Sequence, residues 1–184
     1  YADAHSDLSA LSSFLPAGTL DALRKRAPLS VPCYYAMLRI KLLGSSAEEL
    51  RAIEGMDEGL ENRLRTKCGA PDFAGYLREV STRRYSPSRI RRTLLHLLLG
   101  IRRDLVRDAK SASPLLRVLG LKKGAEDLLS DAGRPLFISP AAASSLPQPL
   151  QKLAEIDALA SDLRALLTDP REFRREFTTG LVKV

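Results

Sequence analysis

Residues 82–101 read TRRYSPSRIRRTLLHLLLGI, and this stretch decides the fold. Ser86 and Pro87 predict a helix start, because Ser caps the free N–H groups of a first turn and Pro fits that turn without losing a hydrogen bond. Five arginines occupy the first eleven positions, and a block of leucines follows them. We therefore expect one long helix that begins at Ser86 and continues to about Asp108.

At about 100° per residue, this predicted helix has two different faces. The apolar residues fall on one side, where they can pack into a core: Ile90, Leu94, Leu97, Leu98, Ile101 and Leu105. The opposite side carries a narrow basic stripe made of Arg89, Arg92, His96, Arg103 and Arg107. The helix thus combines a core face with a cationic face.

The composition of the stripe favours a phosphate-bearing partner. A solvated helix face normally mixes signs, because acidic and basic side chains four residues apart stabilise each other. Here the acids Asp104 and Asp108 fall outside the stripe. Its cations are nearly all arginine, whose planar guanidinium matches phosphate oxygens better than lysine does.

Two other interpretations of the stripe stay open. It could be the well-solvated back of an ordinary core helix. It could also lie on a membrane surface, since basic amphipathic helices bind anionic lipid. The membrane interpretation is less favoured, because such helices usually place Trp or Phe beside an exposed apolar face, whereas this apolar face has several neighbouring helices to pack against.

The composition predicts a helical protein with a substantial core. The chain has 184 residues, of which 45% are hydrophobic and only 5% aromatic, and it lacks tryptophan. We expect an all-α or mainly α fold, a multi-helix orthogonal bundle with at most one or two short strands near residues 116–120 and 135–139. No run approaches the roughly 18 to 20 apolar residues of a spanning helix. We therefore expect a soluble, cytoplasmic protein without membrane contact.

Other helices are predicted from their start and stop signals. Ser46 and Glu49 have the spacing of a capping box. Asp57 is the expected N-cap of a helix that precedes Gly69. The predicted helical ranges are 17–26, 33–44, 46–55, 57–69, 72–82 and 150–169, with one more helix inside 114–133. Cys33 and Cys68 are expected to be buried thiols in a reducing compartment.

The charge is concentrated in one segment. Residues 78–110 contain ten basic and three acidic side chains, so this segment carries the whole net charge of +7. Such asymmetry is typical of a face that binds a polyanion.

Few residues suggest catalysis. His5 and His96 are the only histidines, and neither has a carboxylate at metal-ligand spacing. Glycine-rich dinucleotide loops, phosphate loops and nucleophile elbows are absent from the sequence. The acids of EGLENRL, residues 58–64, are expected to form surface pairs. We assign no catalytic, metal-binding or cofactor-binding residue.

Four stretches together resemble one family. They are EGLENRL, TRRYSPSRIRRTLLHLLLGI, LLRVLGLKKGAEDLL and EIDALASDL. In this order they are similar to the C-terminal half of the bacterial tRNA(Met) cytidine acetate ligase family, from about Tyr34 to the chain end. The family pattern has lysine where Arg83 stands and threonine where Ser86 stands, and both replacements keep the chemistry.

The resemblance implies an enzyme that activates acetate with ATP as acetyl-adenylate and acetylates the wobble cytidine of elongator methionine tRNA. The family's ATP site and its HIGH-type motif lie in an N-terminal nucleotidyltransferase domain. We expect residues 1–28 to be a connector from that domain, here absent, and residues 29–184 to form a C-terminal helical domain. ATP is then expected for the full-length enzyme, with no cofactor in this fragment and no independent catalysis.

The stripe and the resemblance together predict a tRNA-binding accessory domain. Its partners would be tRNA and the absent nucleotidyltransferase domain. The expected RNA-binding residues are Arg83, Arg84, Arg89, Arg92, His96, Arg103 and Arg107. Tyr85 is expected to pack at the helix start rather than stack on a base. The alternative is a helical scaffold that docks the nucleotidyltransferase domain without contacting RNA.

Overall fold

The fold comes from a computed structural model of the chain. It describes residues 13–16, 18–25, 28–57, 59–125, 127–130, 133, 135–137, 139–179 and 181–183. Most of the predicted connector, residues 1–12, 17, 26 and 27, lies outside them.

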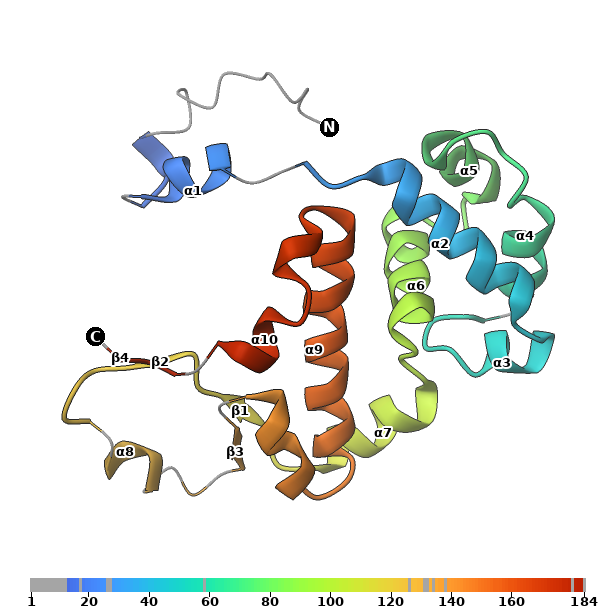
Figure 1. The fold of residues 1–184 in the computed structure, drawn as a ribbon. Coiled ribbons are helices and arrows are strands. Elements are labelled where there is room, and N and C mark those ends of the chain that lie inside the picture. Colours follow the sequence, from blue (N-terminus) through green and yellow to red (C-terminus); the bar gives the residue numbers. More distant parts are fainter. Residues whose placement is uncertain are drawn as a thin grey trace.

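Helices dominate the structure (Figure 1), which confirms the prediction of a mainly helical protein. The α-helices are α1 (Thr19–Lys25), α2 (Val31–Gly44), α3 (Ala47–Arg51), α4 (Leu60–Thr66), α5 (Phe73–Val80), α6 (Pro87–Leu99), α7 (Arg103–Ser111), α8 (Asp127–Ser130), α9 (Leu150–Leu167) and α10 (Arg175–Thr178). Two short 3₁₀ helices, η2 (Pro140–Ser145) and η3 (Pro170–Glu172), flank α9.

The strands are short and pair in parallel. β1 (Leu116–Arg117) pairs with β3 (Leu136–Phe137), at the two places where strands were expected. β2 (Gly120–Leu121) pairs with β4 (Val182–Lys183), so two segments about sixty residues apart in the sequence lie side by side. The second pair was not predicted, because two-residue strands leave no alternating pattern in the sequence.

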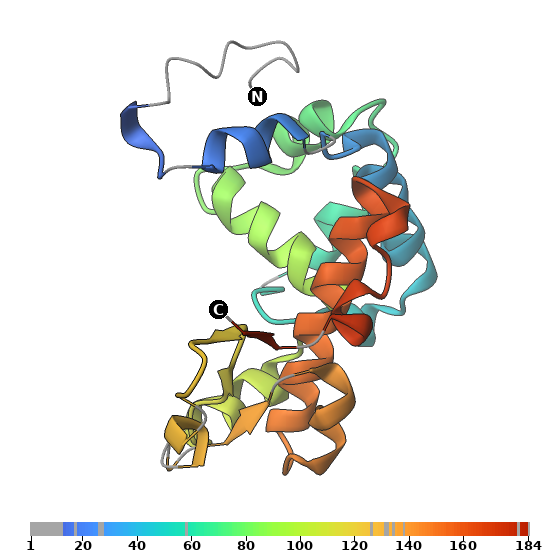
Figure 2. The same cartoon turned by 60° about the vertical axis from the view of Figure 1, so that its left-hand side comes forward.

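The main core lies among α2, α3, α4, α5 and α6. Leu38, Leu42, Leu60, Leu64 and Leu94 are fully buried there. α2 and α6 pack side by side, and α5 covers one end of α6 (Figures 1 and 2). The apolar face predicted for the 87–99 segment therefore meets the core as expected.

A second apolar cluster joins α9 to this core. Leu163 and Leu167 of α9 pack with Leu99 at the end of α6, and Tyr34 and Leu98 belong to both clusters. α9 therefore lies against α2 and α6 (Figures 1 and 2).

The prediction of one helix from Ser86 to Asp108 is wrong at its centre. Ser86 caps α6 as expected, since its Oγ accepts a hydrogen bond from the Arg89 N–H at 3.3 Å. Gly100, however, ends the helix in the left-handed region at φ 66°. α7 begins only at Arg103. Glycine is the usual residue at this position past a helix end, so the stop signal was present in the sequence.

Two further expectations need correction. Asp57 does not cap α4, whose N-cap is Gly59, and Cys33 is exposed although Cys68 is buried. The capping box of Ser46 and Glu49 is confirmed, with hydrogen bonds in both directions. Within the described part of the chain, none of the helices combines the length and apolar character that crossing a membrane requires.

Candidate functional site

The site is built on a loop, residues 52–57, that runs beside the junction between α6 and α7. The Glu54 N–H donates to the carbonyl of Ile101 at 3.0 Å, and the Arg103 N–H donates to the carbonyl of Ala52 at 3.0 Å. Ile53 and Arg102 form an isolated antiparallel bridge. The break at Gly100 thus turns the chain so that its backbone can pair with this loop.

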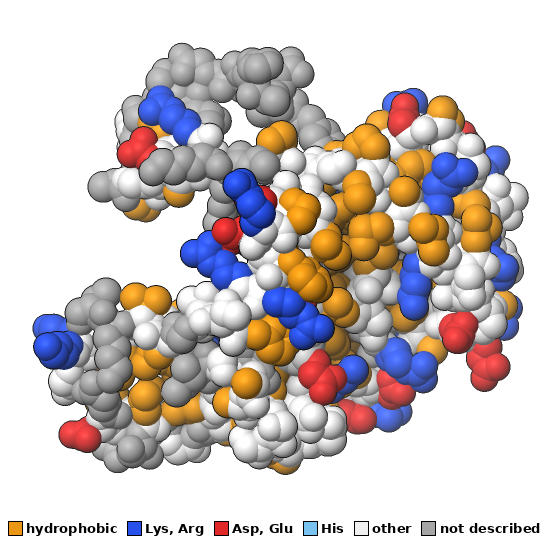
Figure 3. Space-filling view, in the orientation of Figure 1, with side chains coloured by type: hydrophobic (Ala, Val, Ile, Leu, Met, Phe, Trp, Pro, Cys, Tyr) orange, Lys and Arg blue, Asp and Glu red, His pale blue; other side chains and the backbone are white. Residues whose placement is uncertain are grey.

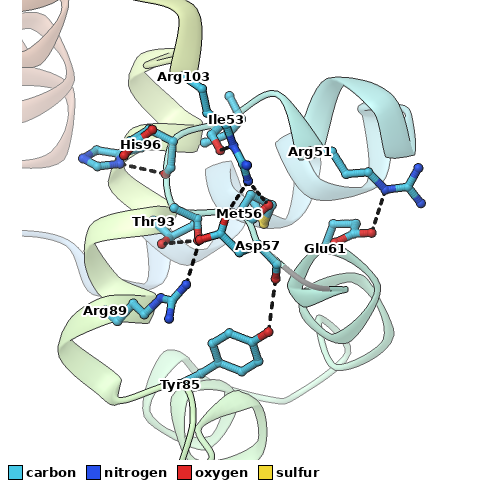
Figure 4. Close-up of polar contacts among 12 residues, drawn as sticks. Arg51, Ile53, Met56, Asp57, Glu61, Tyr85, Arg89, Thr93, His96 and Arg103 are labelled. Atoms are coloured by element: carbon cyan, nitrogen blue, oxygen red, sulfur yellow. Dashed lines mark hydrogen bonds and ion pairs between the residues drawn. The ribbon is translucent and has the colours of Figure 1, made fainter. Parts of the chain in front are cut away.

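Two arginines from different helices bind the carboxylate of Asp57 at the end of the loop (Figure 4). Arg89 of α6 places its Nη2 2.8 Å from Oδ2, and Arg103 of α7 places its Nη2 2.5 Å from Oδ1. Arg103 also donates to the carbonyls of Met56, at 2.5 Å, and Ile53, at 3.4 Å. One carboxylate therefore holds two guanidinium groups side by side.

Two side chains of α6, and Tyr85 just before it, bind the carbonyls of the loop. The Nδ1 of His96 donates to the carbonyl of Glu54 at 2.9 Å. The hydroxyl of Thr93 donates to the carbonyl of Gly55 at 3.4 Å, and the hydroxyl of Tyr85 donates to the carbonyl of Asp57 at 3.1 Å. His96 is therefore a support for the loop, a role that the sequence did not predict.

An open cleft of about 460 Å³ lies beside Asp57. We call it the arginine cleft; its lining residues are Arg51, Met56, Asp57, Arg84, Arg89 and Arg103. This lining contains four arginines and one carboxylate, and two of the arginines, Arg89 and Arg103, bind that carboxylate. Tyr85 supports two of them, because Arg89 and Arg84 lie over its ring at 5.1 Å and 5.9 Å from the centroid. Such an arrangement can bind phosphate oxygens through charge-assisted hydrogen bonds.

Three of the predicted RNA-binding residues lie together in the lining of the arginine cleft: Arg84, Arg89 and Arg103. Arg83 and Arg92 are exposed, and neither side chain forms a hydrogen bond or ion pair with any residue that the structure describes. Arg107 lies on α7 and pairs with Asp108 at 3.1 Å. The predicted stripe was drawn on one continuous helix, so the break at Gly100 divides it between α6 and α7.

Tyr85 is 7% exposed, so packing at the helix start is the better description of this residue. Its ring lies against Arg84 and Arg89, and its hydroxyl binds the Asp57 carbonyl. A ring buried in this way is not available for an RNA base to stack on.

A second, apolar cleft of about 420 Å³ lies between α9 and the pair α2 and α6. Tyr34, Phe73 and Leu95 line it, and Arg91 and Arg164 stand at its edge. On the face shown in Figure 3, apolar side chains gather in the middle, and Lys and Arg side chains lie around them in separate places. The apolar area therefore continues from the core to the surface at this point.

The EGLENRL stretch has a structural role in the residues that are described. Leu60 and Leu64 are fully buried, and the Arg63 guanidinium donates to the carbonyls of Glu79 and Val80 at the end of α5. Glu61 is only 2% exposed and accepts a hydrogen bond from Arg51 at 2.8 Å. The expectation of surface pairs is therefore wrong for Glu61, whose partner comes from α3 rather than from its own helix. Glu58 lies outside the described residues.

Metal ligands do not cluster in the part of the chain described here, where no three His, Cys, Asp or Glu side chains come close enough to hold an ion. At the start of α7, hydrogen bonds from the Arg102 side chain and the Leu105 N–H hold the pKa of the Asp104 carboxyl below its ordinary value. This carboxylate does not line the arginine cleft; it lines a separate cleft together with Gly100 and Lys152.

Comparison with known proteins places the chain among nucleotidyl transferases. A family model described as HIGH Nucleotidyl Transferase matches residues 2–177. A tRNA(Met) cytidine acetate ligase of Listeria monocytogenes is 36% identical over 126 residues, which is 67% of this chain and 31% of that protein. The protein of the same name from Lactobacillus gasseri is 36% identical over 98 residues, or 52% of this chain and 26% of that protein. The chain thus matches between a quarter and a third of the length of these relatives.

Solved structures share the fold. TmcAL of Thermotoga maritima in its apo form has a TM-score of 0.72 and 18% identity, covering 92% of this chain and 46% of that one. The same protein bound with alpha-thio ATP has a TM-score of 0.66 and 20% identity, covering 81% of this chain and 40% of that one.

These matches correct two expectations. The family match extends over residues 2–177, including most of the segment expected to be a connector, so the description of the chain as a C-terminal accessory domain without the nucleotidyltransferase part is wrong. The expectation of no nucleotide in this chain is also wrong, because a nucleotidyl transferase model covers it and a structural neighbour was solved with an ATP analogue. The absent N-terminal domain is accordingly not supported as a partner.

Proposed function

Since this chain belongs to the HIGH nucleotidyl transferase family, we propose that it takes part in the ATP-dependent ligation of acetate to cytidine in tRNA(Met). The names of its relatives give the ligation of acetate to cytidine in tRNA(Met), and the structural neighbour bound with alpha-thio ATP supports the use of ATP. tRNA is then a substrate, and the cytoplasm is where we expect the protein to act. The division of the chain at residues 28 and 29 stays a prediction.

The observation that carries the proposal is the arginine cleft. Its guanidinium groups come from α3, α6, α7 and the segment before α6, and they converge on one open space of about 460 Å³. Phosphate groups suit this space, because each offers several oxygens to the forked donors of arginine. Both expected substrates with phosphate groups, ATP and tRNA, have the chemistry that this cleft recognises.

The residues present fit the phosphate part of ATP. ATP supplies the free energy that joins a carboxylate to an amine. Arg84, Arg89 and Arg103 would hold its phosphate oxygens at the cleft, where Asp57 keeps two of these side chains in place. They would bind and orient the phosphate chain by charge.

The tRNA backbone is the second phosphate source, and here more of the surface can contribute. Phosphate contacts fix an RNA on a protein surface and make binding strongly dependent on salt. We propose that the tRNA-binding residues are Arg83, Arg84, Arg89, Arg92, His96, Arg103 and Arg107. Arg83 and Arg92 extend the cleft along the exposed surface next to it, and His96 contributes by holding the loop.

Binding experiments with two ligands test the proposal. The protein and an Arg89→Ala, Arg103→Ala variant are titrated separately with a tRNA(Met) transcript and with ATP–Mg²⁺. Loss of affinity of about tenfold or more for tRNA assigns the cleft to the tRNA backbone, and the same loss for ATP assigns it to the triphosphate. A Lys152→Ala, Arg171→Ala variant removes two surface cations elsewhere and should bind both ligands normally. Unchanged affinity for both ligands in the cleft variant would overturn the proposal.

A further inference from the structure

Asp57 already binds two of the arginines in the arginine cleft, Arg89 and Arg103. It is the one acidic side chain that lines the cleft among the described residues. Its two carboxylate oxygens each take one guanidinium, Oδ2 from Arg89 and Oδ1 from Arg103 (Figure 4). Two oxygens of a phosphate would present the same pair of acceptors to the same pair of donors.

The loop does not depend on this carboxylate for its position. Arg103 is also bound to the carbonyls of Met56 and Ile53, and His96 holds the carbonyl of Glu54. The hydroxyl of Tyr85 binds the backbone carbonyl of Asp57 and leaves the side chain untouched. The Asp57 side chain can therefore turn away while the loop backbone and Arg103 stay in place.

The ion pairs are accessible to solvent and thus exchangeable. The side chains of Asp57, Arg89 and Arg103 are 39%, 36% and 45% exposed. Ion pairs at such exposure contribute little net stability, because water solvates both partners when they separate. A phosphate bound in a bidentate way to two arginines can compete with a carboxylate under these conditions.

We propose that Asp57 is a built-in competitor for phosphate at the arginine cleft and so sets its specificity. A phosphate enters by displacing the carboxylate from Arg89 and Arg103, and anions too weak to do so are excluded. This inference rests on the proposed function, since it assumes that the cleft binds the phosphates of tRNA. Asp57 lowers the affinity of the cleft while it keeps the two guanidinium groups correctly spaced.

An Asp57→Asn variant distinguishes competition with phosphate from a role of Asp57 that is limited to positioning Arg89 and Arg103. Asparagine keeps the size of the side chain and removes the charge that competes. We expect the variant to bind a tRNA(Met) transcript about three to ten times more tightly in fluorescence anisotropy, because the exposed ion pairs of Asp57 with Arg89 and Arg103 no longer compete with phosphate. Asp57→Glu keeps the competing charge and should bind like the unchanged protein. Glu155→Gln removes one acidic charge on α9, where Glu155 pairs with Lys152, and controls for net charge.

Each outcome decides between the two claims. Weaker or unchanged tRNA binding by Asp57→Asn, together with loss of binding in Arg89→Ala, Arg103→Ala, overturns the competitor role and leaves the proposed function standing. Unchanged binding of both tRNA and ATP–Mg²⁺ in the arginine variant means that the proposed function itself has failed. Loss of ATP–Mg²⁺ binding alone overturns the competitor role toward tRNA and leaves the proposed function standing. If Asp57→Asn does not fold, NMR of the unchanged protein decides: adding tRNA should shift the Asp57 carboxyl signal and the Nε–H signals of Arg89 and Arg103. Absence of these shifts at saturating tRNA overturns the inference.

Discussion

Arg89 and Arg103 lie on separate helices, yet they bind opposite oxygens of the same carboxylate, that of Asp57. This relationship depends on Gly100, which ends α6 and lets α7 start in a new direction. A continuous helix would have carried Arg103 further along the α6 axis. The break therefore converts a predicted linear stripe into a cleft whose donors converge.

Removing an arginine inside the cleft should affect the stability of the fold, whereas removing one outside it should not. Arg92 forms no ion pair with the described residues, so Arg92→Ala should weaken tRNA binding by about 1 kcal/mol and leave the free energy of unfolding unchanged. Arg103→Ala should weaken binding similarly and also destabilise the fold by about 1 kcal/mol, because it loses its bonds to the loop carbonyls. Filter retention and thermal melts measure the two effects. Equal melting temperatures for both variants would contradict the role of Arg103 in holding the loop.

Gly55 should be required at its position in the loop. Its φ is +85°, and a Cβ there would lie 2.7 Å from the hydroxyl oxygen of the buried Thr93. We expect Gly55→Ala to cost about 2 to 3 kcal/mol of unfolding free energy through both effects. Gly59 is a matched control, because it has a φ of +82° with no atom near its Cβ position. Gly59→Ala should cost only about 1 kcal/mol.

Chemical denaturation of both glycine variants checks this difference. Thr93→Ala removes the obstructing hydroxyl and should reduce the additional cost of Gly55→Ala in the double variant. The same cost for both glycine substitutions would show that the close approach to Thr93 does not matter.

Adjacent leucines of α6 should have opposite importance for stability. Leu94 is fully buried, so Leu94→Ala should destabilise the protein by about 2 to 5 kcal/mol through a cavity in the main core. Leu95 is 41% exposed, and Leu95→Ala should cost less than about 1 kcal/mol. Urea unfolding of the two variants measures the contrast. A larger loss of unfolding free energy for Leu95→Ala than for Leu94→Ala would contradict the assignment of Leu94 to the buried face of α6.

Arg51 should stabilise the protein by neutralising a buried carboxylate. Glu61 is 2% exposed, accepts the bond from Arg51, and has its second oxygen without a partner among the described residues. Arg51→Ala should therefore cost about 2 kcal/mol, because it leaves this charge buried and unpaired. Adding Glu61→Gln to Arg51→Ala should recover part of the loss. A double variant less stable than Arg51→Ala would contradict this explanation.

The sequence predicted most local features of α6 but not the geometry of the cleft. The helix start at Ser86, the buried face with Leu94 and the basic segment all follow from short-range patterns. The pairing of Asp57 with Arg89 and Arg103 connects residues far apart in the chain, and no local signal announces such contacts. Gly100 was a local signal for a helix end, but the leucine and arginine pattern continued past it and favoured one helix.

Roles that depend on tertiary contacts were also missed. The pairing of Glu61 with Arg51 and the bond from His96 to Glu54 both join different elements. The acids of residues 58–64 were expected to pair with arginines of the same helix on a solvated surface. The sequence shows only the spacing of residues along one helix, and that spacing favours such pairs. Burial of Glu61 arises from the packing of α4 against α3 and α2, which spacing does not reveal.

The salt dependence of tRNA binding shows whether Arg89 and Arg92 contact phosphates. Binding of a tRNA(Met) transcript to the protein and to an Arg89→Ala, Arg92→Ala variant is measured by filter retention at several salt concentrations. If both arginines contact phosphates, the variant should bind about 2 kcal/mol more weakly and its dependence on salt should fall by about two counterions. The Lys152→Ala, Arg171→Ala control should keep the original affinity and slope. An arginine variant with unchanged affinity and unchanged slope would show that this surface does not bind the tRNA backbone.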